Sequence, residues 1–329
     1  MKAIVVTRHG GPEVLTYQDW PDPVPGEGQV LIRTEITSVN FADVQLRRGT
    51  YHAGSPPPTV PGLDVYGTIV ALGPGVTGLE NGQKVAAFSA SGSYAELALA
   101  PAVLTFPVPA GVDPETAAAF PTVGITAYNL LTLAGRLVPG ETVLVHAAAG
   151  GVGSVALQLA KILGAGRVIG TVGSDKKAAL ARELGCDDVI NYEAEDFAAR
   201  VNEITDGAGA DLILDSVAGP VFDRELSCLA TFGRIVMYGH TSGEAGHVST
   251  RDLHGPTRAV IGYSSSTYRR YRPEALRPAA EAVLGYLAKG RLRMVIGGRF
   301  DLQDAPDAHR LIEKRAHVGK ILLQVRTGG

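Results

Sequence analysis

The sequence predicts a two-domain α/β protein in which a compact β-rich part precedes a doubly wound parallel sheet. The chain has 329 residues, more than one hydrophobic core normally serves. Up to about residue 120, short β-rich runs such as Val30–Ile32 and Thr68–Val70 alternate with Pro and Gly turns. Beyond Pro121, strand-like and helix-like segments alternate, which is typical of βαβ units around a parallel sheet.

The apolar runs of the alternating part predict its elements. Strands are expected at Thr142–His146, Arg167–Val172, Asp188–Asn191, Asp211–Asp215, Gly233–Tyr238 and Ala259–Gly262. Helices between them include Gly153–Leu163, Lys176–Leu184 and Glu195–Ile204. A helix over Pro273–Lys289, a strand near Met294–Phe300, a helix over Ala305–Ala316 and a strand over Lys320–Val325 then follow. We expect these last elements to complete the first domain, so the chain divides into residues 1–122, 123–264 and 265–329.

Composition narrows the class of protein. The hydrophobic fraction of 45% suits a folded chain, and the net charge of -3 argues against nucleic acid as the main partner. Two cysteines, Cys186 and Cys228, are too few for a disulfide framework or a cysteine-rich zinc site. Met1–Val6 is too short an apolar run for a signal peptide, and no 18 apolar residues follow one another. We therefore expect a soluble, cytoplasmic protein without a membrane partner.

A glycine turn follows the first strand of the alternating part. The apolar run Thr142–Val145 leads into an Ala-x-Gly-x-x-Gly version of the dinucleotide fingerprint, in which Ala149 precedes Gly150. Gly150 allows the backbone to approach a pyrophosphate, and Gly153 allows the helix to pack close to the strand. The alternative is a merely tight turn, but its position between a strand and a helix favours a dinucleotide at the helix amino terminus.

The end of the second strand indicates which dinucleotide binds. About 20 residues beyond the glycine turn, where a carboxylate usually meets the ribose of NAD, stands Val172. A hydroxyl at Ser174 and a cation at Lys177 follow, and both suit the 2′-phosphate of NADPH. Two alternatives remain: Lys177 and the lysine before it are merely solvated, or Asp175 turns inward and favours NAD.

The chain resembles the zinc-independent quinone oxidoreductases of the medium-chain dehydrogenase/reductase superfamily, the group that includes zeta-crystallin. The most specific segment is Asn40–Tyr51, which is similar to the pattern Asn-Phe-x-Asp-x-x-x-Arg-x-Gly-x-Tyr. Further similar segments are Pro61 to Gly73, His146 to Gly153 and Val189 to Tyr192. The resemblance implies a GroES-like β-rich catalytic domain, interrupted by a Rossmann domain, with cofactor and substrate in the cleft between them.

The resemblance also implies roles for individual residues. Asn40 would lie near the nicotinamide, and Gly151 and Val152 would touch the pyrophosphate. Ser174, Lys177 and Tyr192 would surround the 2′-phosphate, and Gly173 would be a further cofactor contact. Ser216, Tyr238, Gly239 and His240 would line the cofactor further along. Departures at Gln45, Asp64 and Gln83-Lys84 make the substrate-side contacts less secure than the cofactor contacts.

Zinc ligands are missing where the zinc alcohol dehydrogenases of the superfamily carry them. The matching positions are Asn40 with Asp43, and Leu63 with Asp64. The histidines show no ligand-like pairing; they are His9, His52, His146, His240, His247, His254, His309 and His317. We therefore expect no metal, and His146 is expected to be a core histidine.

Metal-free chemistry favours hydride delivery to an electron-poor, conjugated acceptor, because no Lewis acid is needed to polarise it. Tyr51 is the candidate proton donor, with packing on a loop rim as the alternative. Asp43 is a candidate base, with a buried carboxylate bonded to backbone or to Arg47 as the alternative. We expect the cluster Tyr263–Arg272 to form a solvated turn or a subunit contact, and the strand Ala259–Gly262 to pair in a homodimer.

These observations together predict an NADPH-dependent, zinc-independent reductase of quinones or activated alkenes. A 2-enoyl thioester reductase is the nearest alternative, since it shares the cofactor site. A non-catalytic NADPH-binding protein with a structural or RNA-associated role is the other.

Overall fold

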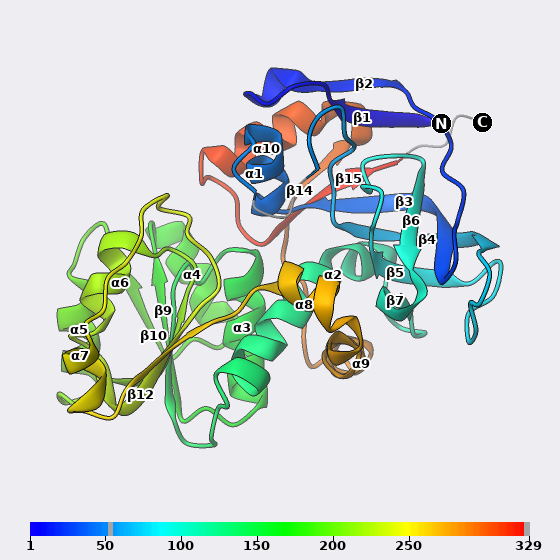
Figure 1. Cartoon of the computed structure of the whole chain (residues 1–329). Coiled ribbons are helices and arrows are strands. Elements are labelled where there is room, and N and C mark those ends of the chain that lie inside the picture. The colour runs from blue at the N-terminus through cyan, green and yellow to red at the C-terminus, as the bar shows by residue number, and fades with distance from the viewer. Residues whose placement is uncertain (52–54, 326–329) are drawn as a thin grey trace. The chain divides into compact units, whose positions relative to one another are not determined.

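The computed structural model describes residues 1–51 and 55–325, and the chain forms two compact units. The first unit combines Met1–Ile125 with Ser266–Gly329, and the second is Thr126–Ser265 (Figure 1). The predicted boundaries at 122 and 264 lie close to these. Each unit has its own hydrophobic core.

The first unit is built on a seven-stranded sheet with the order β14-β15-β3-β4-β5-β7, in which β6 also pairs with β3. Its strands are β3 (Gln29–Val39), β4 (Asp64–Leu72), β5 (Lys84–Phe88), β6 (Leu97–Pro101), β7 (Thr105–Pro107), β14 (Ile296–Asp301) and β15 (Lys320–Gln324). A separate pair joins β1 (Lys2–Val6) to β2 (Leu15–Asp19). All of these pairings are antiparallel except that of β14 with β15.

Strand β15 comes from the end of the described chain and lies against β3 from its beginning. Ile321 is opposite Val39, and Gln324 is opposite Ile36. Strand β4 flanks β3 on the other side, with Asp64 opposite Ser38. The starts of β15 and β4 therefore meet the end of β3, and this junction carries Lys320, Asn40 and Asp64.

The helices of the first unit include a long apolar one that the sequence pattern does not predict. They are α1 (Phe41–Arg48), α2 (Pro114–Asn129), α8 (Ser265–Tyr271), α9 (Arg277–Ala288) and α10 (Ala305–Glu313). With its last turn, the helix Pro114–Ala134 is long and apolar enough to cross a membrane, but 72% of its most apolar window is buried. It is therefore a core helix.

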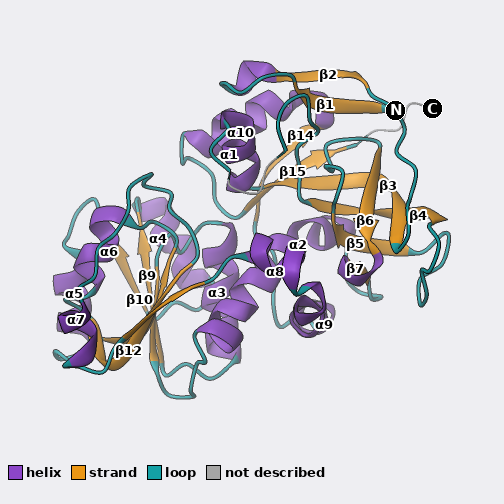
Figure 2. Ribbon diagram, in the orientation of Figure 1, coloured by secondary structure: helices purple, strands orange, loops and turns teal. Residues whose placement is uncertain are grey.

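The second unit is a six-stranded parallel sheet with the order β10-β9-β8-β11-β12-β13. Its strands are β8 (Thr142–Val145), β9 (Arg167–Val172), β10 (Asp188–Asn191), β11 (Ala210–Asp215), β12 (Leu229–Met237) and β13 (Ala259–Gly262). The helices are α3 (Gly151–Ile162), α4 (Asp175–Glu183), α5 (Phe197–Ile204), α6 (Gly219–Glu225) and α7 (Thr250–His254), between which the strands run in Figure 2. The predicted Rossmann fold is confirmed.

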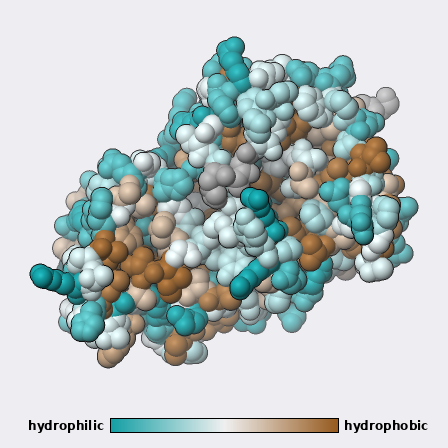
Figure 3. Space-filling view, in the orientation of Figure 1, coloured by the Kyte–Doolittle hydropathy of each residue, from teal (hydrophilic) through white to brown (hydrophobic). Residues whose placement is uncertain are grey.

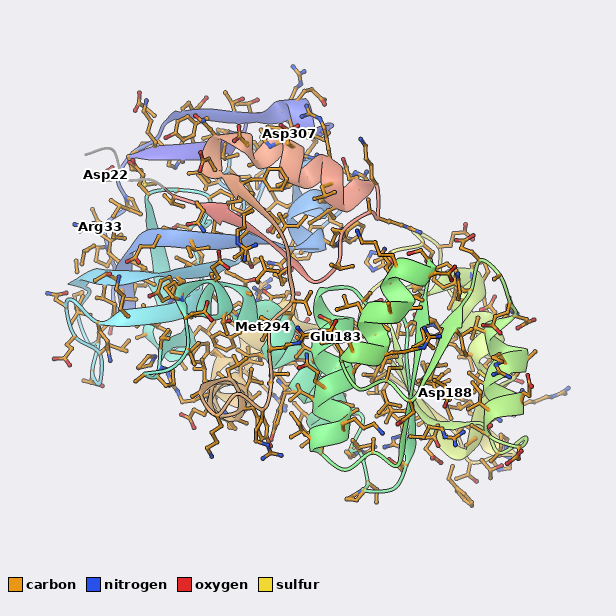
Figure 4. All side chains as sticks on the ribbon, turned by 180° about the vertical axis from the view of Figure 1, so that it is seen from behind. Asp22, Arg33, Glu183, Asp188, Met294 and Asp307 are labelled. Carbon is orange, nitrogen blue, oxygen red and sulfur yellow. The ribbon has the colours of Figure 1, made fainter. Side chains whose placement is uncertain are left out.

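The strand order reverses between β8 and β11, and ligands of open α/β sheets bind beyond the carboxyl ends of the strands at such a point. Asp188 starts β10 and therefore lies at the opposite end of the sheet from the carboxyl ends of the strands, and Glu183 ends α4; both residues are labelled in Figure 4. The cofactor residues predicted in the second unit follow the carboxyl ends of its strands.

The segment Tyr263–Arg272 does not form the predicted turn. Ser265–Tyr271 is helical, as α8. Tyr263 is buried, and its hydroxyl accepts a hydrogen bond from Asn129 Nδ2 at 3.1 Å.

Polar and apolar side chains are interspersed on the visible face of the molecule (Figure 3).

Candidate functional site

The glycine turn of the second unit leaves backbone donors at the start of a helix. Ala147 has a positive φ of 50°, and α3 begins four residues later at Gly151. The N-cap is Gly150, which has no side chain that could cap the helix. The first N–H groups of α3 therefore have no partner within the helix, which is the arrangement that binds phosphate.

Gly153 is required by close packing inside the turn. A Cβ atom at this position would lie 2.3 Å from the carbonyl oxygen of Ala147, whereas one at Gly150 would lie 3.1 Å from the same atom. At position 153, therefore, only Gly fits without movement of the backbone. The turn has the tight geometry expected of a pyrophosphate cradle.

The three residues predicted around a 2′-phosphate, together with Gly173, follow the ends of two neighbouring strands. A Cβ at Gly173 would lie 2.5 Å from the hydroxyl of Tyr192, so these residues are in close contact. Ser174 is the N-cap of α4 and accepts a hydrogen bond from the backbone of Lys177 at 3.4 Å. The sheet therefore gathers a phenol, an aliphatic hydroxyl and a lysine at one edge.

Asp175, the residue that would favour NAD, has another partner. Its Oδ1 accepts a hydrogen bond from Asn191 Nδ2 at 3.1 Å. Since Asn191 ends β10, this bond draws the carboxylate toward that strand. It occupies one oxygen that a ribose hydroxyl would need.

The remaining predicted cofactor residues follow β11 and β12. Tyr238 N donates to Asp215 O at 2.8 Å, and a Cβ at Gly239 would lie 3.0 Å from Ser216 O. Burial raises the pKa of Tyr238 above its usual value. His240 is exposed just beyond. The segments that follow β11 and β12 are thus in contact at the carboxyl edge of the sheet.

His146 is a core histidine, as predicted. It is buried, its Nδ1 lies 2.8 Å from Thr171 Oγ1, and its Nε2 lies 3.0 Å from Glu225 Oε1. Its ring also packs edge-on against Phe197. Burial raises the pKa of Glu225 to about 7, against the opposing effect of His146. The pair is buried, and His146 directly follows β8 just before the glycine turn.

A buried polar cluster lies at the junction of β3, β4 and β15 in the first unit. Asp64 Oδ2 accepts hydrogen bonds from Ser38 Oγ at 2.6 Å, Asn40 Nδ2 at 2.9 Å and Lys320 Nζ at 3.3 Å. Asp64 Oδ1 accepts from Thr122 N at 2.9 Å and Thr122 Oγ1 at 2.6 Å. Each carboxylate oxygen is therefore occupied by several donors.

Lys320 completes this cluster and was not predicted from the sequence. Its Nζ donates to Asn40 Oδ1 at 2.5 Å and to Val39 O at 3.1 Å, besides Asp64. Only 3% of the residue is exposed. Burial lowers the pKa of Lys320, and the nearby carboxylates oppose that shift. A lone lysine opening the apolar run Ile321–Leu323 was the available signal.

Asp43 takes the alternative given for it, in part. It forms a capping box with Asn40, whose N donates to Asp43 Oδ2 at 2.8 Å, and Tyr94 Oη lies 3.3 Å from the same oxygen. Arg47, the other partner considered, pairs with Glu313 instead. Burial raises the pKa of Asp43 to about 7. Asp43 thus caps α1 and is almost completely buried.

Tyr51 meets an arginine of helix α8. Arg269 Nη2 donates to Tyr51 Oη at 3.3 Å, and the guanidinium carbon lies 4.9 Å from the centre of the Phe88 ring. Phe88 is the strand partner of Asp64. Tyr51 and the Asp64 cluster therefore belong to one face of the first unit, linked by Arg269 and Phe88.

Among residues 1–51 and 55–325, no group of three or more His, Cys, Asp or Glu side chains is arranged to hold a metal ion. His52 lies outside the described residues. Cys186 and Cys228 are both buried, and burial raises the pKa of each to about 12.

Comparison with known proteins places both units in one family. The profile described as "Alcohol dehydrogenase GroES-like domain" matches residues 26–110, and that described as "Zinc-binding dehydrogenase" matches residues 151–285. The quinone oxidoreductase of Pseudomonas aeruginosa is 37% identical over 98% of this chain and 99% of its own. The 2-haloacrylate reductase of a Burkholderia species is 33% identical, with 98% of each chain covered.

A solved structure agrees. The Escherichia coli quinone oxidoreductase in complex with NADPH has a TM-score of 0.91 and 34% identity, covering 98% of this chain and all of that one (100%). Sequence and fold thus match over nearly the whole length, and the resemblance inferred from the sequence is confirmed. The chain belongs to the quinone oxidoreductase family of the medium-chain dehydrogenase/reductase superfamily.

Proposed function

We propose that the protein is an NADPH-dependent reductase of quinones or activated alkenes that works without zinc. The observation that carries this proposal is the uncapped start of α3 together with the phenol, hydroxyl and lysine beyond β9 and β10. The relatives named for quinone and haloacrylate reduction support the acceptor class.

The residues of the second unit fit NADPH. The backbone N–H groups of Gly151 and Val152 would hold the pyrophosphate, and Gly153 makes room for it. Ser174, Lys177 and Tyr192 would surround the 2′-phosphate through charge-assisted hydrogen bonds. Ser216, Tyr238, Gly239 and His240 would line the rest of the cofactor. Bound NADPH supplies a hydride, and the protein supplies position and electrostatics.

The donor set of the first unit argues for zinc-free chemistry. Asn40 and Leu63 stand at the positions that correspond to the missing zinc ligands. Asn40 and the residue after Leu63, Asp64, are both bonded to the ammonium of Lys320. A metal ion between them would have to displace this cation. An electron-poor acceptor needs less polarisation than a simple carbonyl, so hydride transfer does not require one.

Reduction of a quinone balances when one hydride and one proton reach the acceptor, which leaves a hydroquinone. We assign the proton to Tyr51, because a phenol can donate a proton and its oxygen accepts a hydrogen bond from Arg269. Asn40 would lie beside the nicotinamide. Asp43 is too deeply buried to meet the acceptor, so we assign it a supporting role as the cap of α1.

Steady-state oxidation of NADPH and NADH with 1,4-benzoquinone, a 2-haloacrylate and a crotonyl thioester tests the proposal. We expect turnover with the quinone or the haloacrylate and a preference for NADPH. Turnover with the thioester alone would instead favour a 2-enoyl thioester reductase. Tight NADPH binding without turnover of any acceptor would contradict an enzymatic role and support a structural or RNA-associated one.

We further propose a cytoplasmic homodimer paired through β13. This edge strand is short, and Ala259–Ile261 are only half-buried in the single chain. Sedimentation of the wild type and of Val260→Pro tests the pairing, because proline removes an edge N–H donor. A monomeric wild type would exclude it.

A further inference from the structure

Lys320 is the one cation bonded directly to Asn40 and Asp64 within the described residues, and no step assigned above uses it. Its Nζ has three acceptors: Val39 O, Asn40 Oδ1 and Asp64 Oδ2. A neutral amine has two N–H donors, whereas an ammonium has three. Three acceptors at 2.5 to 3.3 Å therefore fit the charged form, although burial disfavours it.

This ammonium determines which way the amide of Asn40 faces. Asn40 Oδ1 accepts from Lys320, and Asn40 Nδ2 donates to Asp64 Oδ2 at 2.9 Å. A flipped amide would place its NH₂ group against the ammonium and its oxygen against the carboxylate. Both contacts would be repulsive, so the lysine and the aspartate together select one orientation.

The selected orientation leaves Asn40 with a weakly engaged donor. Within residues 1–51 and 55–325, one of the two hydrogens on Nδ2 goes to Asp64 and the other has only Ser38 O at 3.5 Å. Asn40 as a whole residue is 7% exposed. Negative charge that develops on an acceptor oxygen is stabilised best by a donor whose direction is set beforehand.

We propose that Lys320 is a positioning residue for the reduction, acting through Asn40. Its ammonium holds the amide with Nδ2 available to the reacting groups, and it keeps the positive charge of the cluster next to that donor. The assignment rests on the proposed function, because it concerns the same reaction.

A double-mutant cycle tests this assignment. Lys320→Met, Asn40→Ala and the double variant are assayed for kcat and KM with NADPH and 1,4-benzoquinone, and for NADPH binding by fluorescence. We expect Lys320→Met to lower kcat by about 10²-fold, as loss of one oriented donor does, with NADPH affinity unchanged. The double variant should be no slower than Asn40→Ala alone, because a residue that acts through another adds nothing once that one is gone.

Lys84→Met is the matched control. Lys84 also pairs with a carboxylate in the first unit, that of Glu35, but at the surface, so its removal should leave kcat unchanged. If Lys320→Met does not fold, the charge-neutral pair Asp64→Asn with Lys320→Met replaces it and should show the same loss of kcat.

The positioning role would be overturned if the kcat losses of Lys320→Met and Asn40→Ala multiplied in the double variant. It would also be overturned if a folded Lys320→Met or neutral-pair protein kept wild-type kcat. Either result would leave the proposed function intact. A wild-type protein that turns over no acceptor would overturn both. The two failures are therefore distinguishable.

Discussion

Glu225 and His146 form a buried pair in which the carboxylate Oε1 lies 3.0 Å from the imidazole Nε2. Neither side chain is exposed by more than 3%. The pair joins the end of α6 to the residue that follows β8, directly before the glycine turn. The stability of the second unit, Thr126–Ser265, is therefore coupled to the ionisation of Glu225.

The first prediction concerns pH. The pKa of Glu225 is raised from 4.5 to about 7, so the folded state holds this proton more tightly than the unfolded state. The stabilisation is complete below about pH 4.5 and is lost as pH rises through about 7. The difference corresponds to about 3 kcal/mol. Asp43, with a pKa of about 7, acts in the same direction.

Urea unfolding of the wild type between pH 5 and pH 8 should show the free energy of unfolding falling with pH. In Glu225→Gln the fall should be smaller. Glu193→Gln, at an exposed position of the same unit, should behave as the wild type. An unchanged slope in Glu225→Gln would contradict the assignment.

The second prediction concerns Arg47, which is fully buried and pairs with Glu313. Its Nε and Nη1 have no hydrogen-bond partner in the described part of the protein. Glu313→Gln would leave the guanidinium buried without its counter-charge and should cost about 3 kcal/mol in the free energy of unfolding. Asp307→Asn, which breaks an exposed pair with Arg310 on the same helix, should cost less than about 1 kcal/mol. Equal costs for both variants would argue against the buried pair.

The third prediction compares two glycines. In Gly153→Ala the new Cβ meets the backbone oxygen of Ala147 at 2.3 Å, so the turn must open. We expect lower thermal stability and at least tenfold weaker NADPH binding, on the order of 1.4 kcal/mol. Gly285 lies within α9, with nothing within 4 Å of an added Cβ. Gly285→Ala should raise stability by up to about 1 kcal/mol and leave binding unchanged.

The fourth prediction concerns cofactor choice. Lys177→Ala should weaken NADPH by about tenfold or more, the loss of one charge-assisted contact, and leave NADH nearly unchanged. Lys176→Ala, one residue earlier and exposed, is the control and should affect neither. Isothermal titration with both cofactors provides the measurement. Equal loss of NADPH and NADH in Lys177→Ala would refute the 2′-phosphate contact.

The fifth prediction concerns the proton. Tyr51→Phe removes the hydroxyl that Arg269 contacts and should lower kcat by about 10²-fold without changing NADPH affinity. Tyr17→Phe, at an exposed position of the same unit, should leave kcat unchanged. Full activity of Tyr51→Phe would assign Tyr51 to packing at the rim of its loop.

The second unit could be predicted closely from the sequence because its signals are local. Apolar runs bounded by turn residues mark β9, β10 and β13 to the residue, and the glycine turn marks the start of α3. Strand β12 begins earlier than predicted, at Leu229, because the strand continues through Phe232 at a positive φ of 65°. A register shift near Ala210 accommodates this irregularity.

Other features depend on tertiary context and could not be predicted. Helix α2 contains Pro121 and Gly124, which discourage a helix locally, but burial of its apolar side chains stabilises it. The helical form of Ser265–Tyr271 was missed because its polar residues show no apolar period. The pairing of Arg269 with Tyr51 joins residues 218 positions apart. No local pattern reports such a contact.

The bond between Lys320 and Asp64 joins residues 256 positions apart. During synthesis, Asp64 leaves the ribosome long before its counter-ion exists, because chains emerge from the amino terminus. In that interval the carboxylate must stay hydrated or protonated, so the centre of the first unit cannot close. All of Thr126–Ser265 is synthesised before Lys320, so the whole second unit emerges while the buried cluster of the first unit still lacks its cation.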